Sequence, residues 1–215
     1  MYVIGDCCLI KINQINHIIP WDSVWSLQVK GFKMLQRYLK LAALILGFTK
    51  AGSTRSRAML RESTQIKYIE QNLDHFSFAN NGTFQQKYLI NDQFWNSDHS
   101  GPIFFTIGGE GPIGDDFHND FVVKLAEEFG ALLLAGEHRY YGESQPFGNE
   151  SLSADPEKNG YLTSSQSLAD QARLITHIKG TIKGAENSPV IAFGTSYPGL
   201  MSAWSRVKYP HLFDG

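Results

Sequence analysis

The sequence predicts an α/β fold with a mostly parallel sheet, and three short apolar runs are the main evidence. The runs lie at 102–107, 131–135 and 189–193, and segments with helical spacing separate them. Buried strands that alternate with helices are typical of parallel sheets covered on both faces. Glycine and polar residues follow each run, as expected for the loops at the carboxyl ends of such strands, where ligands gather.

Two further extended segments precede the first apolar run. Residues 67–73 and 83–90 are rich in β-branched and aromatic residues, and the turn-like sequence NNG at 80–82 lies between them. This composition predicts two strands joined by a turn. Residues 54–66 are polar and basic, and we expect them to form a mobile N-terminus of the mature protein.

Three segments are predicted to be helical. Apolar residues at helical spacing predict a helix over 117–129, and Gly130 is a natural stop for it. Similar patterns predict helices over 165–179 and 200–209. The segment 136–161 contains several proline and glycine residues, and we expect a long loop there.

The N-terminal part of the chain resembles a secretory signal. Basic residues precede the apolar run at 41–48, and small residues follow it at 51–53, which is the order found in signal peptides. The basic region is too long when counted from Met1, but it has ordinary proportions when counted from Met34. We therefore interpret 1–33 as a mispredicted extension and 34–53 as the signal peptide. The alternative is that the apolar run is part of a buried helix.

Composition excludes several classes of function. A formal net charge of −2 offers no general attraction to nucleic acid or to an anionic membrane. The run at 41–48 is too short to span a bilayer. Both cysteines, Cys7 and Cys8, lie near the start, so no disulfide is expected within the rest of the chain. We expect no metal and no cofactor.

Asn81 and Asn149 begin Asn-x-Ser/Thr triplets, which predicts N-glycosylation in the secretory pathway.

Ser196 is the strongest candidate for chemistry. It follows the third apolar run in the sequence Gly194-Thr195-Ser196-Tyr197, directly before a predicted helix. An α/β-hydrolase presents its nucleophile on such a strand–turn–helix, and the next residue, here Tyr197, gives its backbone N–H to the oxyanion. The usual G-x-S-x-G pattern is incomplete, because Pro198 stands at its fifth position. Proline disfavours helical backbone at the preceding residue, so Pro198 and the β-branched Thr195 put the turn in question.

A second glycine-rich segment, 108–112, follows the first apolar run. It is either a tight loop with positive φ angles or the source of a second oxyanion donor, and Gly109 and Glu110 are then the candidates. The segment lacks the Lys-Ser/Thr of a phosphate loop and the glycine spacing of a dinucleotide fold, so phosphate binding is disfavoured.

The cluster Glu137-His138-Arg139 ends the second apolar run. His138 could be read as a catalytic base, but in α/β-hydrolases the acid and the histidine follow the nucleophile in the chain. We prefer a structural role, in which Glu137 and Arg139 pair or hydrogen-bond near the floor of the site and His138 is satisfied locally. After Ser196 only His211 and Asp214 remain, and a helix of about ten residues would separate them from the serine by roughly 15 Å. The chain is therefore expected to lack a catalytic acid and base.

Taken together, these residues resemble the serine peptidase family that includes lysosomal Pro-X carboxypeptidase, dipeptidyl peptidase II and thymus-specific serine protease. The resemblance covers about 67–215 and rests on the segments QNLDHFSF (71–78), TFQQKYLIND-FW (83–95), GPIFFTIGGEG (101–111), GALLLAGEHRYYGESQPFG (130–148), YLTSSQSLAD (161–170) and SAWSRVKYPHL (202–212) together with the serine turn.

The resemblance implies an α/β-hydrolase domain with an inserted helical domain, a Ser-Asp-His triad, cleavage next to proline and a lysosomal or extracellular location. Ser196 corresponds to the family's nucleophile and Tyr197 to an oxyanion donor, whereas the family's Asp and His lie downstream of Gly215. Residues 67–215 are thus expected to be the N-terminal portion of an α/β-hydrolase fold, truncated after the helix that follows the nucleophile.

Two functions remain open on the sequence. The first is a serine exopeptidase that cleaves peptides next to proline, as a Pro-X carboxypeptidase or as a dipeptidyl peptidase. The second is a truncated or degenerate relative without turnover, because the acid and the base are missing. The expected partners are peptides with proline near the scissile bond, and the sequence predicts no oligomeric state.

Overall fold

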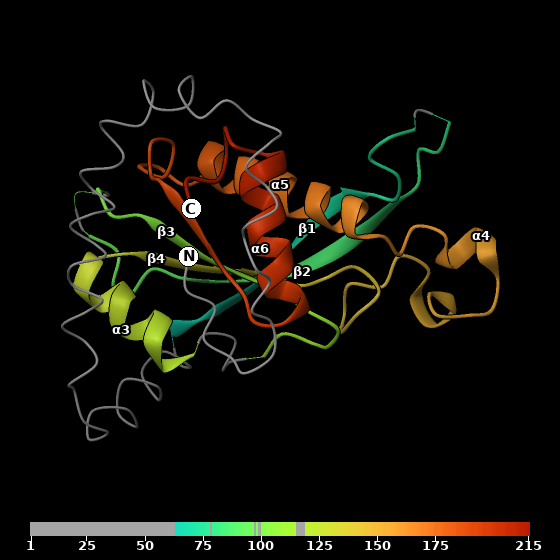
Figure 1. The fold of residues 1–215 in the computed structure, drawn as a ribbon, viewed down its shortest axis with the longest axis horizontal. Coiled ribbons are helices and arrows are strands. Elements are labelled where there is room, and N and C mark those ends of the chain that lie inside the picture. The colour runs from blue at the N-terminus through green and yellow to red at the C-terminus, as the bar shows by residue number, and fades with distance from the viewer. Residues whose placement is uncertain (1–62, 78, 97, 99, 115–118) are drawn as a thin grey trace, which may run out of the picture. The chain divides into compact units, whose positions relative to one another are not determined.

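A five-stranded mixed sheet with helices on both faces forms the core of the computed structural model (Figure 1). The structure describes residues 63–77, 79–96, 98, 100–114 and 119–215. The predictions for 1–33 and 34–53 lie outside these residues, as does most of 54–66. Within the described ranges, no helix is long and apolar enough to cross a membrane.

The sheet has the strand order β1-β2-β4-β3-β5. Its strands are β1 (Gln65–Asn72), β2 (Thr83–Asn91), β3 (Ile103–Ile107), β4 (Leu132–Gly136) and β5 (Val190–Phe193). The three predicted apolar runs are β3, β4 and β5, and they form the parallel half of the sheet. β1 and β2 form an antiparallel hairpin, and β2 pairs antiparallel with β4, so two of the four pairings are antiparallel.

The helices are close to those predicted, with two differences. They are α3 (Asp120–Phe129), the short 3-10 helix η4 (Gly148–Glu150), α4 (Pro156–Asn159), α5 (Ser164–Thr181) and α6 (Tyr197–Lys208). The long loop expected over 136–161 contains η4 and α4, because the Asp155 side chain caps the first turn of α4 and Pro156 fits at its start. The helix after the serine begins at Tyr197 rather than Leu200, since proline is tolerated in a first turn whose N–H groups lack partners anyway.

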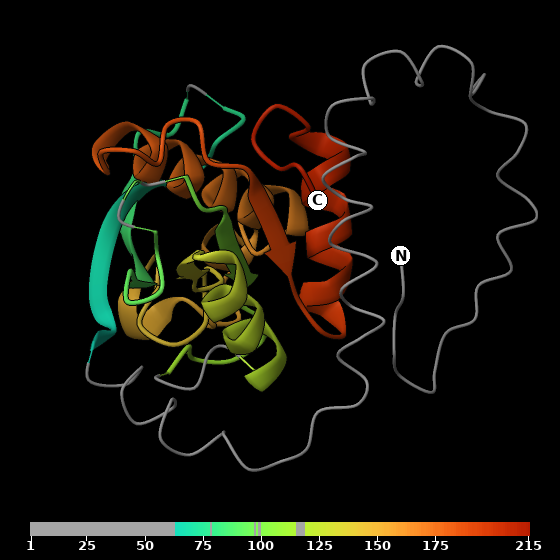
Figure 2. The ribbon, with the colours of Figure 1, turned by 90° about the vertical axis from the view of Figure 1, so that its left-hand side faces the viewer.

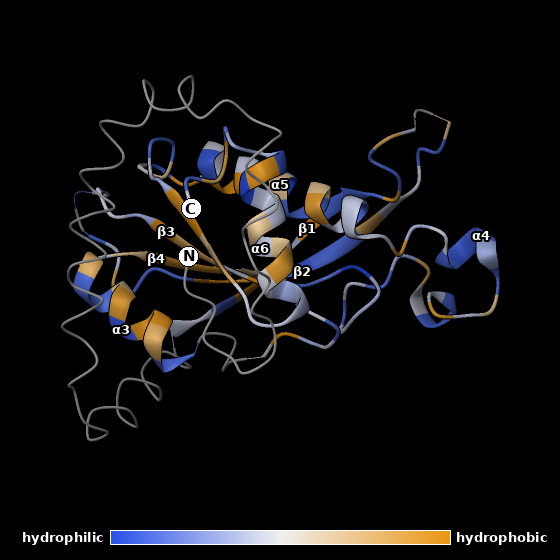
Figure 3. Cartoon of the chain, viewed as in Figure 1, coloured by the Kyte–Doolittle hydropathy of each residue, from blue (hydrophilic) through white to orange (hydrophobic). Residues whose placement is uncertain are grey.

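Alternate residues of β3 and β4 face opposite layers of helices. Ile103, Phe105 and Leu134 pack with α5 and α6, whereas Phe104 and Leu133 pack with α3. Figure 3 shows the apolar residues gathered along the central strands, between the two layers. Both faces of these strands are therefore buried, which explains why their sequences are apolar without alternation.

The predicted stop of α3 at Gly130 is confirmed. Gly130 adopts a left-handed conformation with φ 58° and returns its N–H to the carbonyl of Ala126. A Cβ atom there would lie 1.9 Å from Oδ1 of Asn96, so no larger residue fits. The glycine lets the chain turn at once from α3 into β4.

A buried ion pair connects β4 to α5. Arg139, three residues past β4, donates from Nε and Nη2 to the two carboxylate oxygens of Asp170, at 2.7 Å each, and neither side chain is exposed. Nη1 of Arg139 also donates to the carbonyl of Leu73 at 2.8 Å. His75 contacts the same carboxylate at 2.7 Å. The pair thus holds α5, the end of the hairpin and the loop after β4 together.

Replacing Asp170 by Asn should lower the free energy of unfolding by about 3–5 kcal/mol, because it leaves the Arg139 guanidinium buried without a counter-charge. Urea-induced unfolding followed by circular dichroism measures the effect. Glu150→Gln is the matched control, since it breaks a pair between Glu150 and Lys158 at the surface. Equal shifts of the two midpoints would show that burial of the Arg139 pair is unimportant.

Candidate active site

Ser196 lies at a strained turn between β5 and α6. Figure 2 shows β5 leading into the red helix α6 through this turn. Its backbone has φ 60° and ψ −129°, and among the described residues Tyr140 is the other non-glycine residue with a positive φ. Such a conformation is costly for a residue with a Cβ atom and recurs at functional sites. The side chain is exposed. The geometry is that of a nucleophile elbow.

The elbow requires close approach of the strand to the helix. A Cβ atom on Gly194 would lie 2.3 Å from both the carbonyl carbon and the oxygen of Pro198, in the first turn of α6. Thr195 is tolerated between Gly194 and Ser196 because it is exposed. Pro198 does not prevent the turn, since α6 runs from Tyr197 and makes its first hydrogen bond from Leu200 N to Ser196 O.

The glycine-rich loop after β3 packs directly against this helix. A Cβ atom on Gly109 would lie 2.7 Å from Cγ of Pro198, whereas one on Gly111 would meet nothing within 4 Å. Gly108 N donates to Gly136 O at 2.9 Å, which holds the start of the loop beside β4. The structure therefore brings the two predicted oxyanion segments together, with Gly109 against the proline that follows Tyr197.

Glu137 holds both the glycine-rich loop and the loop after β4. Its buried carboxylate accepts from Ile113 N at 3.0 Å through one oxygen. The other oxygen accepts from Glu143 N, Ser144 N and the Ser144 hydroxyl, at 2.9, 2.9 and 2.7 Å. Charge-assisted bonds of this kind stabilise a buried carboxylate without a cation. Glu137 and Arg139 thus hydrogen-bond as expected, but to different partners and not to each other.

His138 is buried beneath the elbow, with both ring nitrogens in contact with polar atoms. Nδ1 lies 2.7 Å from the carbonyl oxygen of Arg139, and Nε2 lies 3.1 Å from the hydroxyl of Tyr197. Burial lowers the pKa of the imidazole, and burial also raises the pKa of the Tyr197 hydroxyl. Only Nδ1 has the local partner that the structural interpretation of the sequence expects, because the partner of Nε2 comes from α6.

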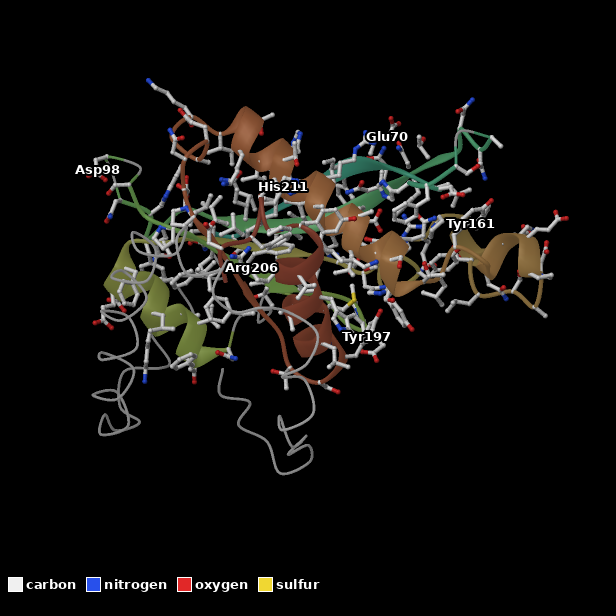
Figure 4. The ribbon with its side chains drawn as sticks, turned by 45° about the horizontal axis from the view of Figure 1, so that its top comes forward. Glu70, Asp98, Tyr161, Tyr197, Arg206 and His211 are labelled. Atoms are coloured by element: carbon white, nitrogen blue, oxygen red, sulfur yellow. The ribbon has the colours of Figure 1, made fainter. Side chains whose placement is uncertain are left out.

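His211 and Asp214 lie away from Ser196. Figure 4 shows Tyr197 and His211 toward opposite ends of α6. Asp214 accepts from Val190 N at 2.9 Å, so its carboxylate lies at the start of β5, whereas Ser196 follows the end of that strand. In the part of the chain that the structure describes, neither residue can contact the serine.

The remaining predicted sites are on the surface. Asn81 is exposed in the turn between β1 and β2, and Asn149 is exposed in η4. No group of three or more His, Cys, Asp or Glu side chains among the described residues is arranged to hold a metal ion.

The sheet, its helices and the serine turn have the architecture of a partial α/β-hydrolase fold. The chain belongs to the serine carboxypeptidase S28 family, whose model matches residues 71–215. This confirms the family to which the sequence motifs pointed.

Relatives in this family cover most of the described chain. The chain is 49% identical to lysosomal Pro-X carboxypeptidase of Bos taurus over 164 residues, which are 76% of this chain and 32% of the relative. It is 36% identical to the thymus-specific serine protease of Homo sapiens over 149 residues, which are 69% of this chain and 28% of the relative. The chain thus spans about one third of the length of the curated relatives it matches.

Solved structures with a partial likeness include a post-proline cleaving enzyme from Rickettsia typhi. It is 17% identical, has a TM-score of 0.43, and the match covers 71% of this chain and 20% of that enzyme.

Gly109→Ala should lower the free energy of unfolding by about 1–3 kcal/mol, because the new methyl group overlaps the Pro198 ring. Pro198→Ala removes Cγ, so the same glycine replacement should be tolerated better in that background. A double-mutant cycle measured by urea unfolding checks this coupling. Gly111→Ala, on the open part of the same loop, is the control. If the two substitutions change the free energy of unfolding additively, the contact between Gly109 and Pro198 is contradicted.

Glu137→Gln should release the glycine-rich loop. The substitution replaces one carboxylate oxygen by an NH2 group, which cannot accept a hydrogen bond. At least one of the backbone donors on these loops then loses its partner, which costs about 1–3 kcal/mol. Hydrogen exchange at the Ile113 and Ser144 amides, compared with amides in β1, measures the local effect. Unchanged protection at both amides would mean that the Glu137 carboxylate does not hold these loops.

Proposed function

We propose that Ser196 is the nucleophile of a serine exopeptidase that acts on peptides next to proline. The observation that carries the proposal is the strained, exposed Ser196 at the end of β5, with Gly109 packed against the first turn of α6. This arrangement supports a nucleophile and backbone donors at the carboxyl ends of β3 and β5. The named relatives, Pro-X carboxypeptidases above all, support peptides as the substrate class.

The reaction would proceed through an acyl-enzyme. Ser196 Oγ attacks the scissile carbonyl, and the backbone N–H of Tyr197 stabilises the oxyanion, with Gly109 or Glu110 supplying the second donor. A base must take the proton of Ser196 and then protonate the leaving amine. The described residues after Ser196 supply no such base, so complete turnover requires groups that these residues do not provide.

The carboxypeptidase reaction is favoured over the dipeptidyl one by the relatives named Pro-X carboxypeptidase, with identities of 46–49%. Their names also support a lysosomal or secretory location, and the Asn-x-Ser/Thr triplets that begin at Asn81 and Asn149 accord with it.

The second candidate is a relative without turnover. The observation in its favour is the departure of the serine turn from the usual G-x-S-x-G pattern, with the β-branched Thr195 directly before Ser196 and Pro198 at the fifth position. In this case the scaffold and the serine remain, but the serine is nearly unreactive because no base activates it.

A fluorophosphonate probe should label Ser196 in the gene product that contains these 215 residues, and Ser196→Ala should abolish labelling. Ser202→Ala is the matched control, because this hydroxyl lies in the same helix and donates to Pro198 O. Intact-protein mass spectrometry measures the adduct. Undiminished labelling of Ser196→Ala would exclude this serine as the nucleophile.

Peptides with a penultimate proline and a free carboxylate separate the remaining possibilities. Release of the C-terminal residue supports the carboxypeptidase, and release of an N-terminal Xaa-Pro dipeptide from other peptides supports the dipeptidyl peptidase. Absence of both products and of labelling supports the relative without turnover.

A further inference from the structure

We propose that His138 is a positioning residue of the nucleophile elbow: its neutral imidazole accepts a hydrogen bond from the hydroxyl of Tyr197 and thereby fixes the first residue of α6, whose backbone N–H is the candidate oxyanion donor. The inference concerns the elbow's geometry and rests on the proposed function only for its catalytic consequence.

The tautomer of His138 follows from its partners. The carbonyl oxygen of Arg139, 2.7 Å from Nδ1, can only accept, so Nδ1 carries the proton. In a neutral imidazole Nε2 then has a lone pair and no hydrogen, and the Tyr197 hydroxyl at 3.1 Å must donate to it. The main chain of the loop after β4 therefore determines which nitrogen of His138 carries the proton and which one faces Tyr197.

The contact is well placed to hold Tyr197. The ring centroids of His138 and Tyr197 lie 5.6 Å apart, and Tyr141 packs edge-on against His138 with a centroid distance of 5.4 Å. His138 is only 1% exposed, so water does not replace the bond when it breaks. Tyr197 has no side-chain cap before it, because Ser196 makes no capping hydrogen bond. The hydrogen bond from the Tyr197 hydroxyl to His138 thus stabilises the first turn of α6, as a capping hydrogen bond would otherwise do.

Protonation would break this contact. A proton on Nε2 turns the acceptor into a donor, and the Tyr197 hydroxyl then loses its partner. The charged groups around His138 act in both directions: Asp170 and Glu110 favour the imidazolium, whereas Arg139 disfavours it. Burial outweighs them, so the pKa of His138 lies below the ordinary histidine value of about 6.5. The contact is therefore intact at neutral pH and is lost as the pH falls through this lowered pKa.

The first test observes the protonation of the His138 ring directly and does not require peptidase activity. Nitrogen-15 NMR of the 215-residue chain labelled at histidine should show His138 with Nδ1 protonated and Nε2 unprotonated at pH 7.5. Tyr197→Phe should change the Nε2 shift of His138, and Tyr141→Phe, the matched control, should leave it nearly unchanged. A proton on Nε2 at this pH would overturn the proposal.

The second test asks whether the contact holds the elbow. Hydrogen exchange at Leu200, whose amide donates to Ser196 O, reports opening of the first turn, and β4 amides give the reference. Tyr197→Phe and His138→Asn should each lower the protection factor at Leu200 about fivefold, and the double variant no further. Equal losses in β4 would indicate a general loss of stability and would contradict a positioning role.

The pH dependence distinguishes positioning from packing. In the unmodified chain, protection at Leu200 relative to β4 should fall as the pH is lowered through the pKa of His138, which burial holds below the ordinary histidine value. His138→Gln retains an acceptor near Nε2 but does not titrate, so it should keep the protection without the pH dependence. In Tyr197→Phe, the protection factor at Leu200 should be low and should not change with pH. A pH dependence that persists in Tyr197→Phe would overturn the proposal, whereas failure of the peptidase assays would leave these readouts unaffected.

Discussion

Three consecutive buried polar residues at the end of β4 impose the constraint on which the site depends. Glu137, His138 and Arg139 are all withdrawn from water, and a buried polar group without a partner is strongly destabilising. Each side chain finds its partners in a different segment. Glu137 accepts a hydrogen bond from the segment after β3, and His138 contacts Tyr197 of α6. Arg139 donates hydrogen bonds to α5 and to the end of the hairpin. One tripeptide thus determines the relative placement of the elements around the serine.

The second constraint is steric. β5 and the first turn of α6 approach so closely that Gly194 has no room for a Cβ atom, and at Gly109 the glycine-rich loop also lies too close to Pro198 for one. Rigid contacts of this kind hold a strained residue in place, because relaxing Ser196 would require moving both the strand and the loop. The positive φ of Ser196 is therefore supported by packing on both sides.

The fold was largely predictable from sequence because its signals are local. The apolar runs predict β3, β4 and β5, of which β3 and β4 are buried on both faces and β5 is only partly buried, and Gly130 ends α3 where the pattern indicated. The antiparallel pairing of β2 with β4 was not predicted, since strand direction within a sheet depends on long-range contacts. Neither was α4, whose few residues carry no hydrophobic periodicity.

The candidate site, like the fold, has features that the sequence predicts and features that only long-range contacts decide. The sequence by itself determined that Ser196 follows a buried strand, that a glycine-rich loop follows another, and that Glu137, His138 and Arg139 end a third. Only the tertiary structure decided their partners: Asp170 for Arg139, Ile113 for Glu137 and the Tyr197 hydroxyl for His138. The physical reason is that periodicity and turn chemistry act between near neighbours in the chain. Hydrogen bonds to buried side chains instead depend on which distant segments the packed core brings together.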